Sequence, residues 1–62
     1  MKLIADQILL RAITAHQSGK LEEAESLYRK VLKTQPKNLA ANNNLATILE
    51  HSGKLEEAET YY

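Results

Sequence analysis

The 62-residue chain contains no cysteine, tryptophan or phenylalanine, and it has only one proline and two glycines. Without cysteine the chain cannot form a disulfide. Because its two histidines are too few for the four Cys and His ligands of a structural zinc site, we expect no such site. Eight Lys and Arg residues balance eight Asp and Glu residues. No net field therefore draws the chain to nucleic acid or to an anionic membrane, and we expect neither as a partner.

Long apolar runs are also missing. The N-terminal stretch Met1–Ala5 is apolar in part, but Asp6, Gln7 and Arg11 interrupt it before it reaches the length of a signal-peptide core. No segment approaches the ~20 apolar residues that a membrane span requires. We therefore expect a soluble, cytoplasmic protein.

Residue patterns that support chemistry are scarce too. His16 and His51 each lack a second ligand four residues away, so neither predicts a metal site. Gly19-Lys20 lacks the upstream glycine and the following Ser or Thr of a phosphate-binding loop. The sequence thus predicts no catalytic, metal-binding or cofactor-binding residue, and we expect the chain not to be an enzyme.

What the sequence does contain is an internal repeat. Residues 18–28 and 52–62 are identical at nine of eleven positions, with a constant offset of 34 residues. A period of this length is typical of stacked helix–turn–helix repeats. Such stacks build extended surfaces that hold a partner.

Apolar residues at helical spacing predict four helices, over residues 3–17, 21–34, 39–51 and 55–62. Gly19 suits the left-handed conformation that ends a helix, and Pro36 biases the residue before it away from helical geometry. Asn38 is a suitable N-cap for the third helix. Because the connections are short, neighbouring helices should be antiparallel, and the predicted fold class is all-α.

The first helix carries two groups of apolar residues. We predict that Ile4, Ile8, Ala12 and Ala15 form its core stripe. Leu9 and Ile13 face away from that stripe, and the sequence leaves open whether another chain, a neighbouring repeat or a ligand covers them.

Several of these positions recur one period apart. They are glycines at Gly19 and Gly53, small residues at Ala12, Ala24, Ala46 and Ala58, and aromatics at Tyr28 and Tyr62. The single proline, Pro36, lies in the turn that closes the first period. In this pattern residues 5–62 resemble the tetratricopeptide repeat family, with one repeat over about 5–38 and a truncated second repeat over 39–62. The pattern departs from the family at Ile8 and Asn42, where a large aromatic is common, and at Arg11, where the residue is usually apolar.

The resemblance implies a stack of about one and a half repeats whose first helices line a concave groove for a protein or peptide. The groove positions carried over from the family are Asp6, Leu9, Ile13, Gln17, Ala40, Asn43, Asn44, Thr47 and His51. Three consecutive asparagines, 42–44, disfavour a helix. Either they form a solvated face, or Asn43 and Asn44 contact the partner.

Two further hypotheses concern what surrounds these residues. Repeats bury their faces only against neighbours, so we predict self-association or a helix swap through Leu55, Ala58, Tyr61 and Tyr62. The run Asn44-Leu45-Ala46 is also similar to repeats of O-linked N-acetylglucosamine transferases, and residues 16–25 resemble repeats that precede bacterial glycosyltransferase and sulfotransferase domains. The alternative function is therefore that of a leader in a larger transferase.

Overall fold

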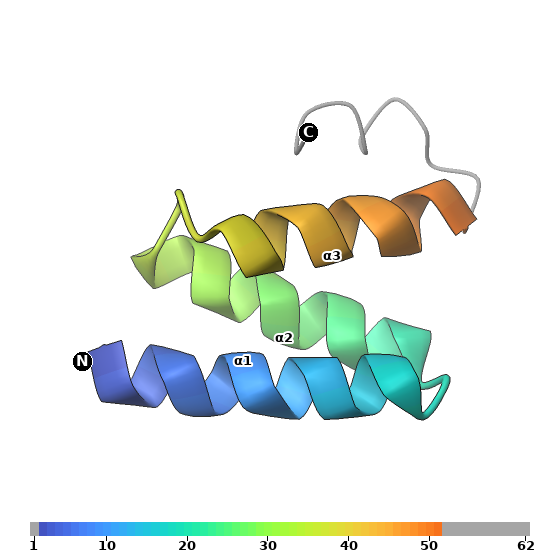
Figure 1. Cartoon of the computed structure of the whole chain (residues 1–62), viewed down its shortest axis with the longest axis horizontal. Helices are drawn as coiled ribbons and strands as arrows, with labels where there is room; N and C mark the ends of the chain where they lie inside the picture. Colours follow the sequence, from blue (N-terminus) through green and yellow to red (C-terminus); the bar gives the residue numbers. More distant parts are fainter. Residues whose placement is uncertain (1, 52–62) are drawn as a thin grey trace.

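The computed structural model describes residues 2–51, which form three helices: α1 (Lys2–Gln17), α2 (Leu21–Thr34) and α3 (Leu39–His51). The helices lie in layers, with α2 between α1 and α3 (Figure 1). The direction of α2 is opposite to that of its two neighbours. This arrangement confirms the predicted all-α, antiparallel helix–turn–helix fold. The predicted fourth helix lies outside the described residues, together with the four residues assigned to self-association.

The turn between α1 and α2 is built around Gly19, which has a φ of +79°. The backbone amide of Gly19 donates to the carbonyl of His16 at 3.1 Å, and the amide of Lys20 donates to the carbonyl of Ala15 at 2.9 Å. These two bonds are the pair that defines a Schellman motif. They satisfy carbonyls that the end of α1 would otherwise leave unpaired, and the predicted left-handed role of Gly19 is confirmed.

The turn between α2 and α3 depends on Asn38. Its side-chain oxygen accepts a hydrogen bond from the backbone amide of Ala41 at 2.9 Å, which confirms the predicted N-cap. Its side-chain nitrogen donates to the side-chain oxygen of Gln35, also at 2.9 Å. α2 ends at Thr34, two residues before Pro36, as the restriction on the residue preceding a proline requires.

A single apolar core joins the three helices. Its members are Ala12, Ala15, Ala24, Leu27, Tyr28, Val31, Ala41, Leu45, Ala46, Ile48 and Leu49. Ala12 and Ala24 are completely buried, and their small side chains let neighbouring helix backbones approach closely. No polar side-chain atom in the described part of the chain is buried without a hydrogen bond.

The core stripe of α1 differs from the prediction at its N-terminal end. Ile4, predicted to be in the core, is 56% exposed, whereas Ala5 is 4% exposed. Ile8 is only partly buried, although it packs against the core. The reason is geometric: positions four apart drift by about 40° per step around a helix, so Ile4 lies about 80° from Ala12, while Ala5 lies about 20° from it.

Candidate functional site

The α1 residues predicted to line a groove are partly exposed. Asp6 and Gln17 are exposed, and Leu9 and Ile13 are half-buried and pack against the core. The prediction that Leu9 and Ile13 face away from the core is therefore wrong. Leu9 lies only about 40° around the helix from buried Ala5, so its side chain reaches the core on one side and leaves the other side open.

The α3 residues predicted to line the groove recur at intervals of three or four, so they share one side of the helix. Ala40 and Thr47 are half-buried, whereas Asn43 and His51 are exposed. The hydroxyl of Thr47 donates to the backbone carbonyl of Asn43 at 3.0 Å. The side-chain amide of Asn43 is exposed and makes no hydrogen bond to another residue between 2 and 51.

The three consecutive asparagines have three different environments. The side-chain nitrogen of Asn42 donates to the backbone carbonyls of Asn38 at 2.9 Å and Pro36 at 3.1 Å. The side chain of Asn44 hydrogen-bonds to the hydroxyl of Tyr28 on α2. The run is therefore neither wholly solvated nor wholly available to a partner. Asn42 orders the preceding turn, Asn44 joins α3 to α2, and a partner contact by Asn43 stays a prediction.

A polar cluster that the sequence did not indicate links all three helices. The hydroxyl of the fully buried Tyr28 lies 3.4 Å from Nδ1 of His16 on α1, and the two rings meet edge to face at 6.1 Å. On its other side the hydroxyl meets the Asn44 side chain. Burial raises the pKa of Tyr28, and the hydrogen bond from Asn44 partly opposes that rise. The sequence could have indicated this cluster in one way, because a tyrosine predicted to be buried needs a polar partner for its hydroxyl.

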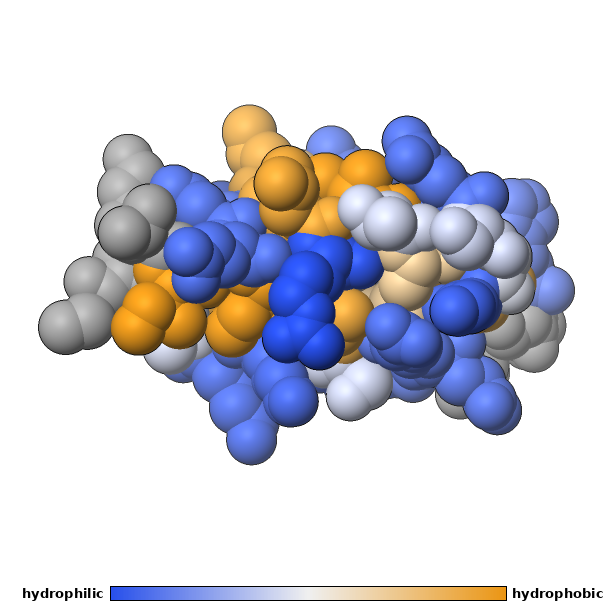
Figure 2. Space-filling model, turned by 90° about the horizontal axis from the view of Figure 1, so that it is seen from below, coloured by the Kyte–Doolittle hydropathy of each residue, from blue (hydrophilic) through white to orange (hydrophobic). Residues whose placement is uncertain are grey.

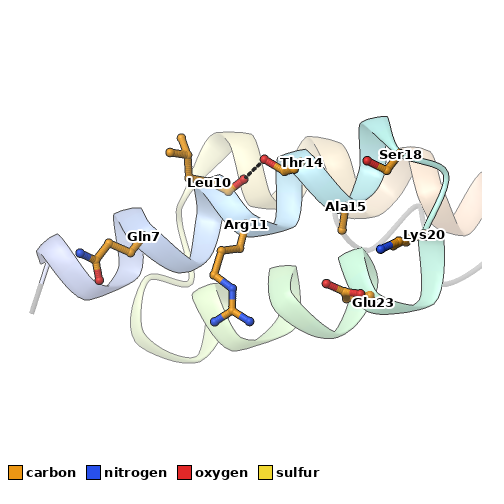
Figure 3. A pocket seen from close by; sticks show the side chains of 8 residues that line it. All are labelled: Gln7, Leu10, Arg11, Thr14, Ala15, Ser18, Lys20 and Glu23. Atoms are coloured by element: carbon orange, nitrogen blue, oxygen red, sulfur yellow. Dashed lines mark hydrogen bonds between the residues drawn. The ribbon is translucent and has the colours of Figure 1, made fainter.

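A shallow cleft of about 490 Å³ lies on a different side of α1, where α1 meets the start of α2 (Figure 3). Its lining residues are Gln7, Leu10, Arg11, Thr14, Ala15, Ser18, Lys20 and Glu23. The hydroxyl of Thr14 donates to the backbone carbonyl of Leu10 at 3.0 Å. None of the predicted groove residues lines this cleft, so the two surfaces of α1 are distinct.

The part of the chain that the structure describes contains neither a metal-binding cluster nor a membrane-spanning helix. Among residues 2–51, no three His, Cys, Asp or Glu side chains lie close enough together to hold a metal ion. None of the three helices is long and apolar enough to cross a membrane.

Paired antiparallel helices, a glycine turn and small residues at the helix crossings define a helical repeat protein. The sequence model of the tetratricopeptide repeat matches residues 15–62, and the chain belongs to this family. No curated protein and no solved structure matches the chain significantly. Tetratricopeptide repeats generally mediate protein–protein interaction. The match does not extend to the transferase resemblance, which stays a prediction from Asn44-Leu45-Ala46 and residues 16–25.

Proposed function

We propose that the chain is an interaction scaffold that binds a peptide segment of a partner protein along α1 and α3. The observation that carries this proposal is the contrast between two equivalent pairs of residues. Leu9 and Ile13 on α1 are apolar and half-buried. Their counterparts 34 residues later, Asn43 and Thr47, are polar, and Asn43 is exposed. The proposed groove therefore has an apolar half and a polar half.

Each half suits a different part of a peptide. The open sides of Leu9 and Ile13 gain from contact with an apolar side chain of the partner, because that contact removes apolar surface from water. The side-chain amide of Asn43 both donates and accepts hydrogen bonds, so it can pair with a backbone amide of the peptide. Asp6, Gln17 and His51 would flank the bound segment.

Selection of peptides from a random library on the wild-type protein tests this proposal. The affinity of a selected peptide is then measured by calorimetry for Asn43→Ala and for the matched variant Gln7→Ala. Both variants remove one exposed amide from a helix, but Gln7 lies on the other side of α1. We expect Asn43→Ala to weaken binding by roughly tenfold, which is about 1.4 kcal/mol, and Gln7→Ala to leave it unchanged.

Failure to select any peptide would contradict the proposed groove. Equal affinities for the wild type and Asn43→Ala would also contradict it, as would an equal loss in Gln7→Ala. Circular dichroism of each variant checks that a change in affinity does not come from loss of the fold.

We also propose that the chain self-associates through residues 55–62, and in particular through Leu55, Ala58, Tyr61 and Tyr62. Their counterparts in α2 are Leu21, Ala24, Leu27 and Tyr28. Of these, Ala24 and Tyr28 are completely buried, because α2 has a helix on each side. A helix of another molecule packed against residues 55–62 would give this segment the same burial. Sedimentation equilibrium showing a constant monomer mass over a hundredfold concentration range would rule this out.

A further inference from the structure

The 34-residue period assigns each residue of α1 a counterpart in α3, but the two helices present different faces to α2. Ala5 of α1 is 4% exposed, whereas its counterpart Leu39 is 76% exposed. α3 instead packs against α2 with a face whose central residues are completely buried: Ala41, Leu45 and Ile48. Any further helix stacked on α1 in the same way would therefore meet the α1 counterparts of these three residues.

Those counterparts are polar, and they are exposed: Gln7, Arg11 and Thr14. We call the surface formed by these three residues and Leu10 the outer face of α1. Figure 2, which views the molecule from the α1 side, shows hydrophilic residues crossing the middle of this side between apolar ones. Arg11 stands where Leu45 is completely buried in α3, and burial of an unpaired guanidinium is strongly unfavourable.

The residue next to Arg11 presents a second mismatch. Asn44, which bonds to the hydroxyl of Tyr28 across the interface of α2 and α3, has Leu10 as its counterpart. In a helix stacked on α1, the residue equivalent to Tyr28 is Tyr62. Its hydroxyl would meet the apolar Leu10 instead of an amide, so the bond that joins Asn44 to Tyr28 has no equivalent at this position.

The first two acidic residues of the stacked helix would not neutralise Arg11. Glu56 and Glu57 correspond to Glu22 and Glu23 of α2. Glu22 and Glu23 are exposed, so carboxylates at these two positions lie away from the face that α3 covers.

We infer that the outer face of α1 is an end cap, which prevents a second copy of the chain from stacking on it head to tail. A head-to-tail contact does not close on itself and would lead to open filaments. A polar outer face at the end of a repeat stack opposes such growth. Any self-association then has to use a surface other than the outer face of α1, and two copies that meet through one shared surface stop at a dimer.

A triple variant that gives α1 the residues of α3 tests the end cap: Gln7→Ala, Arg11→Leu and Thr14→Ile. The matched control places the same three residues at the same spacing on an exposed side of α2: Ser26→Ala, Lys30→Leu and Lys33→Ile. Sedimentation velocity of the full chain is recorded for the wild type and both variants at increasing concentration. We expect the wild type and the control to stay at or below a dimer, and the triple variant to form a growing series of larger species.

The outcomes separate the end cap from the proposed self-association. A monomeric wild type with a growing triple variant supports the end cap and rejects dimerisation, whereas a dimeric wild type with a growing triple variant supports both. Growth of the wild type beyond a dimer overturns the end cap. A triple variant that behaves like the wild type overturns it as well, and so does equal growth of the control.

Discussion

The hydroxyl of Tyr28 is the residue-scale feature that connects the three described helices. It lies in the core, 3.4 Å from His16 on one side and bonded to Asn44 on the other. Tyr28→Phe removes the hydroxyl and leaves the Asn44 side chain without this partner. We expect the free energy of unfolding, measured by urea denaturation at neutral pH, to fall by about 1 kcal/mol. Thr14→Val, which removes an exposed hydroxyl, should change it by less than about 0.5 kcal/mol.

The same residue predicts a pH dependence. Burial raises the pKa of Tyr28 in the folded protein above its ordinary value of 10.0, so folding favours the neutral hydroxyl. The corresponding stability is fully present below pH 10.0 and is lost as the pH rises from there through the folded-state pKa. The difference in unfolding free energy between wild type and Tyr28→Phe should therefore stay constant up to about pH 9 and shrink as the pH is raised above 10.0. A difference that stays constant above pH 10.0 as well would contradict the prediction.

At the scale of helices and turns, local residue chemistry set the element boundaries correctly. Residues 21–34 and 39–51 were predicted as helices and match α2 and α3. The predicted first helix differs from α1 by one residue at its start. Glycine in a left-handed conformation, a proline after a helix and an asparagine N-cap act within a few residues of themselves, so they can be recognised without knowing the rest of the fold.

The turn between α1 and α2 provides the prediction at this scale. A Cβ added at Gly19 would meet no atom within 4 Å, so the effect of Gly19→Ala comes from the positive φ alone. We expect a loss of about 1 kcal/mol in unfolding free energy, measured by urea denaturation, because alanine disfavours this conformation. Gly19→Asn should lose less, since asparagine tolerates the left-handed region better. Equal losses in the two variants would contradict the explanation by the positive φ.

At the scale of the whole molecule, the sequence that begins α2 is present twice. Residues 18–28 lead into α2, which lies between α1 and α3, and residues 52–62 repeat them at nine of eleven positions. If a second copy packs against residues 55–62, folding is coupled to association, and stability depends on concentration. We expect the thermal unfolding midpoint to rise by several degrees over a hundredfold increase in protein concentration. Tyr62→Ala should weaken this dependence, whereas Lys30→Ala, an exposed change on α2, should keep it. A midpoint that is independent of concentration in the wild type would exclude the coupling.

The candidate groove was predicted less completely than the fold. Asp6, Gln17, Asn43 and His51 are exposed at positions taken from the family pattern. The half-burial of Leu9 and Ile13 could not be foreseen from helical periodicity, because it depends on how far α1 is rotated about its axis against α2. The bond between Asn44 and Tyr28 was also missed, since these residues are sixteen positions apart and meet only when α3 packs on α2.

The sequence by itself determined the helices, their caps, the antiparallel connections and the repeat period, because each follows from local conformational preferences or from the spacing of apolar residues. Only the tertiary structure decided which face each helix presents. Counterparts such as Arg11 and Leu45 differ in exposure because α1 and α3 meet α2 from opposite sides. Burial is a property of what lies across an interface, and a repeat pattern does not specify which of its faces will have a neighbour.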